Sequence, residues 1–181
     1  MDLTSLSKFL SYVLRHHPES IGLELDHNGW ADVSALISKA QAEGKPLDRD
    51  ILEQIMEHGS KQRFILSEDG EYIRAGYGHS VDLDLQLKPQ KPPKELYHGT
   101  AHRNVDSIME QGIKPGSRNF VHLSATQEEA QNVGSRHGSA VILLVNAVMM
   151  ADKGFNFFQS ESEPDIWLTK KVPSEFVEPK Q

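Results

Sequence analysis

The sequence predicts an α+β protein of two lobes joined by a proline-rich linker. Three observations support this fold class. Residues 4–75 carry three helical patterns followed by a hairpin pattern, and a lysine- and proline-rich stretch at 88–93 interrupts all periodicity. Residues 96–177 then carry many short strand patterns with two small helices between them. We therefore predict one lobe at 1–88 and a second at 89–181.

The first predicted helix covers residues 4–16. Its apolar residues recur at helical spacing: Leu6, Phe9, Leu10, Val13 and Leu14. Pro18 ends the helix, because the residue before a proline is pushed out of the helical region. Arg15, His16 and His17 therefore lie at its C-terminal end, where positive charges complement the helix dipole.

Two further helices and a hairpin complete the first lobe. Asp32 and Asp48 are predicted N-caps, and Gly59 follows the end of the last helix. Extended runs at 63–66 and 72–75 flank a Ser-Glu-Asp-Gly turn, which predicts a β-hairpin. This order of elements is that of a winged helix, a fold that often binds nucleic acid but does not by itself define a function.

The segment that leads into the linker is harder to assign. Arg63, at the start of the hairpin, is interpreted from its position alone as a solvated residue at a strand edge. We interpret residues 76–80 as a plain turn, because two glycines occur there. The alternation of Leu83, Leu85 and Leu87 with polar residues predicts a short strand running into the linker.

The second lobe opens with a strand pattern at 96–98, which we expect Gly99 and Thr100 to interrupt. A helix follows and ends at Gly112, a natural C-terminal glycine. Beyond it we predict a polar loop and a strand, at 115–119 and 121–124.

The remaining elements of this lobe have local signals. Thr126 and Glu129 form a capping-box pattern for a helix that runs to about Val133. Residues 140–145 are continuously apolar, which predicts a central strand buried on both faces. One helical turn and three short strands are predicted at 147–152, 155–158, 166–169 and 175–177.

The composition restricts the function. The 181 residues include no cysteine, so disulfides, thiolate nucleophiles and cysteine-based zinc sites are excluded. No stretch approaches the roughly eighteen apolar residues of a membrane span and no secretory signal is evident, so we expect a cytoplasmic protein. The formal charge of −7 argues against broad, non-specific nucleic-acid binding. Any anion site must therefore be a small local cluster of positive groups and not an extended basic surface.

No dedicated metal-ligand spacing, nucleophile elbow or phosphate-binding glycine loop occurs in the sequence. The remaining candidates are cationic and imidazole groups at element ends: Arg15, His16, Arg63, His98, Arg118, His122 and Arg136. Arginine forks bind phosphate through paired N–H donors, so these residues predict an anion-handling site. Glu161 or Glu163 is an alternative catalytic carboxylate, although a surface position is commoner for such residues.

Seven motifs occur in order along nearly the whole chain: LSKFLSYVLRHHP, GWADV, KQRF, GHS, YHGT, SRN-x-VHLS and IWLT. Together they resemble the NAD-dependent RNA 2′-phosphotransferase family (tRNA 2′-phosphotransferases). The resemblance implies an N-terminal winged-helix lobe that binds RNA and an ADP-ribosyltransferase-like lobe that binds NAD. It also implies two substrates, an RNA with an internal 2′-phosphate and NAD, with no metal ion. We expect a monomer.

The resemblance also implies site residues. The family's Arg-His-Arg-Arg set matches Arg15, His16, Arg63 and Arg118, and the register favours His16 over His17 as the catalytic imidazole. Its NAD-contacting motifs match His98, Gly99, Thr100, His122 and Ser124. Where many protein-modifying transferases carry a catalytic glutamate, residues 165–168 are mostly apolar. An apolar residue there fits a substrate that brings its own anionic nucleophile.

The implied reaction has two steps. The RNA 2′-phosphate attacks the nicotinamide ribose of NAD and expels nicotinamide, and the ribose 2″-hydroxyl then attacks that phosphorus. The products are 2′-OH RNA and ADP-ribose 1″,2″-cyclic phosphate. Two alternatives stay open at this point. One is an ADP-ribosyltransferase acting on another nucleic-acid phosphate end or a protein, and the other is a catalytically silent RNA-binding regulator.

Overall fold

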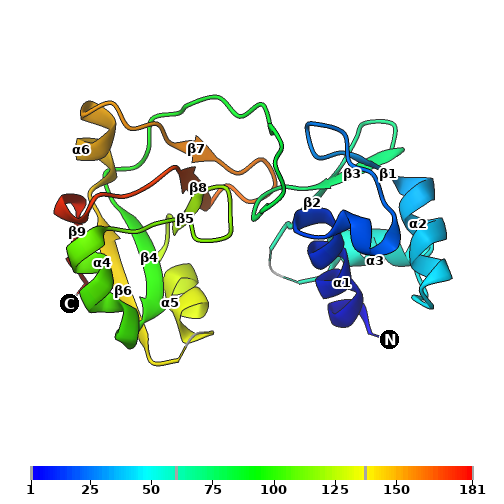
Figure 1. The fold of residues 1–181 in the computed structure, drawn as a ribbon, viewed down its shortest axis with the longest axis horizontal. Helices are drawn as coiled ribbons and strands as arrows, with labels where there is room; N and C mark the ends of the chain where they lie inside the picture. The colour runs from blue at the N-terminus through cyan, green and yellow to red at the C-terminus, as the bar shows by residue number, and fades with distance from the viewer. Residues whose placement is uncertain (1, 60, 137, 181) are drawn as a thin grey trace. The chain divides into compact units, whose positions relative to one another are not determined.

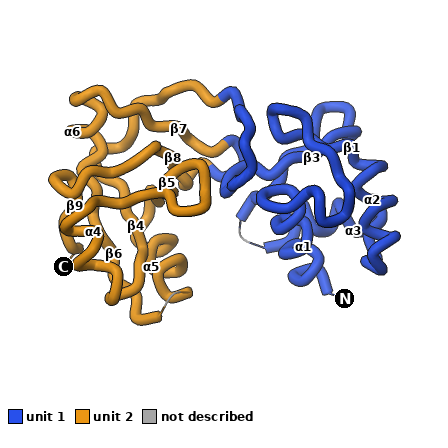
Figure 2. Tube along the Cα trace, in the orientation of Figure 1, with its two compact units in different colours: residues 1–86, 161–163 blue, residues 87–160, 164–181 orange. Residues whose placement is uncertain are grey.

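The structure, a computed structural model, has a mixed α+β architecture (Figure 1). N-terminal helices with a small sheet are followed by a six-stranded antiparallel sheet with helices. It describes three stretches of the chain, residues 2–59, 61–136 and 138–180. The chain divides into two compact units, which Figure 2 colours separately: residues 1–86 with 161–163, and residues 87–160 with 164–181.

Helix α1 (Leu3–Arg15) begins the first unit and matches the predicted helix within one residue at each end. Asp2 is its N-cap, because the carboxylate accepts a hydrogen bond from the backbone N–H of Ser5 at 2.7 Å. One face of the helix is fully buried in the core of this unit, through Leu6, Leu10, Val13 and Leu14. His16 follows as the C-cap. The buried face of α1 therefore fixes the position of the helix end that carries Arg15 and His16.

Helices α2 (Val33–Ala42) and α3 (Arg49–Glu57) confirm the two predicted N-caps. The carboxylate of Asp32 accepts from the N–H of Ala35, and that of Asp48 accepts from the N–H of Ile51, each at 2.8 Å. A short 3₁₀ helix, η1 (Pro18–Ile21), starts at the proline that ends α1.

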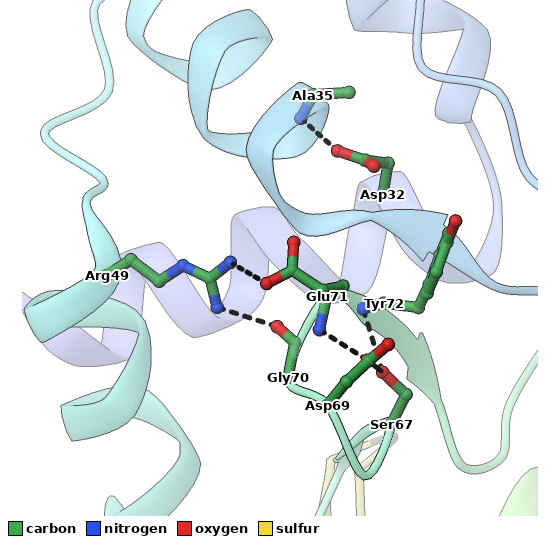
Figure 3. A network of polar contacts seen from close by, with 8 residues as sticks. All are labelled: Asp32, Ala35, Arg49, Ser67, Asp69, Gly70, Glu71 and Tyr72. Atoms are coloured by element: carbon green, nitrogen blue, oxygen red, sulfur yellow. Dashed lines mark hydrogen bonds and ion pairs between the residues drawn. The ribbon is translucent and has the colours of Figure 1, made fainter.

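The predicted hairpin is confirmed as β2 (Phe64–Leu66) and β3 (Tyr72–Ala75), which pair antiparallel. A third short strand, β1 (Ala31–Asp32), pairs with β3 and gives the order β1-β3-β2. Arg49 of α3 ties helix and hairpin together, since its guanidinium donates to the carbonyl of Gly70 at 2.7 Å and lies 3.6 Å from the carboxylate of Glu71 (Figure 3).

The strand predicted for residues 83–87 is wrong. Within the described part of the chain this segment forms no strand, and Gln86 adopts a left-handed backbone with φ of 59°. A left-handed residue breaks an extended run, so alternation of leucines did not reflect a strand. Leu85 is buried, and both Leu85 and Leu83 lie near Gly29, so these leucines pack against the turn that contains Gly29.

The second unit is built on one antiparallel sheet with strand order β7-β8-β5-β4-β6-β9. Its strands are β4 (Leu96–Ala101), β5 (Val121–Ser124), β6 (Ala140–Val145), β7 (Phe158–Gln159), β8 (Ile166–Thr169) and β9 (Val177–Pro179). Two predicted strands lie further along the chain than expected. Strand β7 begins at Phe158 rather than at residue 155, and β9 begins at Val177, after a 3₁₀ turn, η3 (Ser174–Phe176). Strand β6 is interior as predicted, but only its C-terminal half is buried.

Strand β4 continues through Gly99 and Thr100, where an interruption was predicted. Helix α5 (Gln127–Ser135) packs against β4, and a Cβ atom at Gly99 would overlap the carbonyl oxygen of Ala130 in that helix. The glycine therefore permits a close approach of helix to strand and does not mark a turn.

Three helices accompany this sheet. Helix α4 (Val105–Gln111) follows the 3₁₀ turn η2 (His102–Asn104) and ends at Gly112, whose φ of 81° suits glycine. The capping box of α5 is confirmed, since the hydroxyl of Thr126 accepts from the N–H of Glu129 at 3.3 Å. Helix α6 (Ala147–Asp152) matches the predicted helical turn. Among the described residues, no helix is both long enough and apolar enough to span a bilayer.

Candidate active site

Arg15 and His16 stand at the end of α1, and a loop of the same unit lies against both. We call residues 77–80 the 77–80 loop. The guanidinium carbon of Arg15 lies 4.7 Å from the ring centre of Tyr77, within the range of a cation–π contact. Gly78 has a φ of 90°, and a Cβ atom there would come within 3.0 Å of the Arg15 Nε. The buried Arg15 side chain is thus held by an aromatic ring and a glycine backbone.

The other half of the 77–80 loop contacts the backbone of Arg15 and the ring of His16. The N–H of Ser80 donates to the carbonyl of Arg15 at 2.9 Å. The hydroxyl of Ser80 lies 2.7 Å from Nδ1 of His16, which is a short hydrogen bond. His17 points elsewhere, since its Nδ1 lies 2.9 Å from the carboxylate of Glu19 and its ring packs on Tyr12 at 4.8 Å.

The environment of His79, in the 77–80 loop, is both buried and positively charged. Only 3% of the residue is exposed, and neither ring nitrogen has a hydrogen-bond partner among the described residues. Burial, together with the nearby positive charges of Arg15, Arg74 and His16, lowers the pKa of His79 from 6.5 to about 4. The imidazole is therefore neutral near pH 7, in a locally positive region of an acidic chain.

Arg63 approaches the same loop through its backbone. It lies directly before β2, half-buried, and its carbonyl accepts from the N–H of Gly76 at 2.9 Å. The hairpin ladder thus extends by one bond to the residue that precedes the 77–80 loop. The 77–80 loop therefore contacts Arg15 and His16 directly, and the backbone of Arg63 pairs with the residue just before this loop.

The fourth predicted catalytic residue, Arg118, belongs to the second unit. It is half-buried in the turn before β5, and its N–H donates to the carbonyl of Pro115 at 3.3 Å. Strand β5 follows and carries His122 and Ser124 of the predicted NAD motif, so Arg118 lies just before that motif in the chain.

The two predicted histidines of the second unit come from neighbouring strands. Nδ1 of His98 lies 3.4 Å from the carbonyl of His122, and Nδ1 of His122 lies 3.0 Å from the carbonyl of Phe120. Because a carbonyl only accepts, each Nδ1 must carry the proton for these contacts to be hydrogen bonds. In the neutral rings Nε2 then holds the lone pair and can accept from a hydroxyl donor. Nε2 of His122 is buried, so only His98 is suited to a ligand hydroxyl in this structure.

Three other predicted NAD-binding residues have packing roles of their own. Gly99 permits the approach of α5, as described above. The hydroxyl of Thr100 accepts from the side-chain amide of Asn104 at 3.3 Å, and Thr100 is only 5% exposed. Ser124 is buried as well and pairs with Tyr97 across β4 and β5.

Glu161, one of the two alternative catalytic carboxylates, has an ion-pair partner. Its carboxylate accepts from Nη2 of Arg74 at 2.6 Å. Arg74 is almost fully buried, and its guanidinium lies 4.4 Å from the ring centre of Trp30. Glu163, the other alternative, accepts from the backbone N–H of Gln62 at 3.2 Å. Both carboxylates therefore have structural partners in the first unit.

The sequence missed the residues that hold Arg15 and His16. Tyr77, Gly78 and Ser80 were interpreted as parts of a plain turn, although the GHS motif was a signal that this turn matters. Arg74 carried no signal, because its partner Glu161 is 87 residues away in the chain. Over the described residues, no group of three or more His, Asp or Glu side chains could hold a metal ion.

Comparison with known proteins assigns this chain to a family. A family model described as RNA 2′-phosphotransferase, Tpt1 / KptA family, matches residues 2–171. A relative from Agrobacterium fabrum is 50% identical over 174 residues, which cover 96% of this chain and 92% of the relative. Relatives from Pseudomonas aeruginosa and Escherichia coli are 51% and 48% identical, covering 97% and 98% of this chain and 96% of each relative. All three carry the name "Probable RNA 2′-phosphotransferase".

Proposed function

Because this chain belongs to the RNA 2′-phosphotransferase, Tpt1 / KptA family and is a transferase, we propose that it transfers an internal RNA 2′-phosphate to NAD. The products are 2′-OH RNA, ADP-ribose 1″,2″-cyclic phosphate and nicotinamide, and the intermediate is a 2′-phospho-ADP-ribosylated RNA. The observation that supports this most is that Arg15 and His16 both contact the 77–80 loop in a locally positive region.

The two lobes have separate tasks in this proposal. Residues 1–88 form a winged helix that binds RNA, and three helices followed by the β2–β3 hairpin support this role. Residues 89–181 form an ADP-ribosyltransferase-like lobe that binds NAD. In its sheet, the three strands that carry YHGT, VHLS and IWLT are neighbours: β4, β5 and β8. This adjacency supports one ligand site built from all three motifs.

The donor set of the second unit fits NAD. In its Nδ1–H form, half-buried His98 is suited to accept from a ribose hydroxyl through Nε2, whereas Nε2 of His122 is buried. Thr100 and Ser124 on the same strands are buried as well. NAD supplies an electrophilic ribose carbon and nicotinamide as its leaving group. The residues of β8 are all buried, with no carboxylate among them, which fits a nucleophile that is already anionic.

In the first step, Arg15 and Arg63 bind the RNA 2′-phosphate and orient one of its oxygens for attack. A guanidinium keeps its charge and binds two phosphate oxygens at once. Binding then turns an encounter of two substrates into an oriented reaction, which lowers the barrier by removing much of its entropic cost. The phosphate is anionic at neutral pH, so this step needs no general base.

In the second step, the 2″-hydroxyl oxygen bonds to phosphorus as the bond from phosphorus to the RNA 2′-oxygen breaks. Arg118 stabilises the negative charge that develops on the phosphorus oxygens. His16, in its protonated form, gives the proton on Nε2 to the departing 2′-oxygen, and the proton of the attacking hydroxyl goes to water.

One assay tests this function. The protein is incubated with a short RNA that bears one internal 2′-phosphate, with and without NAD and in the presence of EDTA. We expect the 2′-phosphate to be lost only when NAD is added. An RNA that stays phosphorylated and unmodified under all conditions would contradict the proposal and favour a silent RNA-binding protein. ADP-ribose that remains on the RNA would show the first step without the second.

A further inference from the structure

Ser80 makes two contacts with consecutive residues of α1. Its backbone N–H donates to the carbonyl of Arg15 at 2.9 Å, and its hydroxyl lies 2.7 Å from Nδ1 of His16. We propose that Ser80 is a positioning residue that holds the proton of His16 on Nδ1 and leaves Nε2 as the nitrogen that exchanges a proton with the RNA. The catalytic half of this inference rests on the proposed function.

The chemistry of the two groups supports this assignment. A serine hydroxyl accepts as well as donates, so it can receive the Nδ1–H of His16 both before and after Nε2 gives up its proton. In the protonated ring the bond is charge-assisted and therefore stronger. The short distance between the Ser80 hydroxyl and Nδ1 agrees with such a bond. A partner on Nδ1 fixes both the ring orientation and the tautomer.

The loop around Ser80 is built to keep this contact. His79, next to it, is 3% exposed, and Tyr77 and Gly78 are packed against Arg15. The backbone bond from Ser80 to Arg15 survives replacement of the side chain, because it involves only main-chain atoms. A Ser80→Ala variant therefore removes one hydroxyl from an otherwise anchored loop, and its effects report on His16.

The first experiment reads the tautomer directly in the protein without substrates. Long-range ¹H–¹⁵N spectra of the histidine rings are recorded above the pH at which His16 titrates. In the wild type we expect His16 with the proton on Nδ1. In Ser80→Ala we expect the signals to move toward those of the Nε2–H form, which imidazole side chains prefer in water. Unchanged His16 signals in this variant would overturn the proposal.

The second experiment measures the two steps separately, by following the modified RNA intermediate and the cyclic phosphate product over time. We expect Ser80→Ala to slow the second step roughly 10- to 100-fold and to leave the first step within about twofold, so that the intermediate accumulates. Ser80→Thr keeps a hydroxyl and should restore the second step. Equal slowing of both steps, or no rescue by threonine, would contradict a role through His16.

A matched control comes from the same region. Ser20 also uses its hydroxyl near the end of α1, but it donates to the backbone carbonyl of His17, at 2.7 Å, and not to a histidine ring. Ser20→Ala should leave the His16 signals and both rates unchanged, and a matching loss in this variant would count against a specific role of Ser80. If the wild type showed neither step, the proposed function would fail while the tautomer measurement still decided the role of Ser80.

Discussion

At the scale of single residues, the end of α1 combines two groups that suit anion chemistry. Arg15 is buried, with its guanidinium packed on the ring of Tyr77 and its carbonyl bonded to the N–H of Ser80. A guanidinium keeps its charge at any working pH. His79 responds to the same positive region by staying neutral. None of these contacts is local in sequence, since the hydroxyl of Ser80 is 64 residues from His16. Sequence motifs indicated Arg15 and His16, but only the structure shows what holds them.

Replacing Arg15 with lysine tests whether the planar fork matters. Lysine keeps the charge but has no paired N–H donors and stacks less well on Tyr77. We expect Arg15→Lys to lower kcat/KM for a 2′-phosphorylated RNA by about 10- to 100-fold. Arg49→Lys is the control, because Arg49 serves the hairpin turn of the same unit. Activity at the wild-type level in Arg15→Lys would exclude bidentate binding of the phosphate.

His79 should make the stability of the protein depend on pH. The folded protein lowers the pKa of this histidine from 6.5 to about 4, so the fold favours the neutral ring. The contribution is intact above about pH 6.5 and is lost as the pH falls toward 4, by about 3 kcal/mol in total. Urea unfolding of wild type and His79→Leu between pH 7 and pH 4 measures this. The free energy of unfolding should fall less steeply in the variant, and parallel curves would contradict the assignment.

At the scale of elements, local signals predicted the helices well and the strands less well. The caps of α2, α3 and α5 were predictable because Asp32, Asp48 and Thr126 bond to N–H groups three residues away. Strands depend on distant partners. The leucines of 83–87 alternate like a strand but pack differently, and β4 runs through a glycine that serves a helix from another part of the chain.

The close approach of α5 to β4 predicts the effect of a methyl group at Gly99. Gly99→Ala places a Cβ atom in overlap with the carbonyl of Ala130, and a backbone atom cannot move aside cheaply. We expect a loss of at least about 3 kcal/mol in the free energy of unfolding. Gly44→Ala is the comparison, because no atom lies within 4 Å of its Cβ position and only its φ of 78° is unfavourable. Equal losses of unfolding free energy in the two variants would show that α5 can shift away from β4, which would contradict the prediction.

At the scale of the whole molecule, the proposed function needs one localised anion site in an acidic chain. A formal charge of −7 leaves little attraction for RNA in general, so we propose that Arg15 and Arg63 bind the one extra phosphate. Family membership covers residues 2–171 and was foreseen from motifs spread over both lobes. Without the motifs, the cationic and imidazole residues at element ends predicted only an anion-handling site, because the sequence does not show which side chains converge.

The acidic chain predicts a weak dependence of RNA binding on salt. About three phosphate contacts on a single strand give a slope near −2 in a plot of log affinity against log salt concentration. An otherwise identical RNA without the 2′-phosphate should bind more weakly and with a shallower slope. Fluorescence anisotropy with the two RNAs measures both quantities. A steep slope shared by the two RNAs would instead indicate an extended basic face.

We propose that the RNA 2′-phosphate itself is transferred to the NAD-derived ribose. The most direct measurement places a ³²P label in the 2′-phosphate of a short RNA and follows the label after NAD is added. We expect the label to appear in ADP-ribose 1″,2″-cyclic phosphate, after passing through an ADP-ribosylated RNA. Label that is released as inorganic phosphate, or that stays on the RNA whether or not NAD is present, would contradict it.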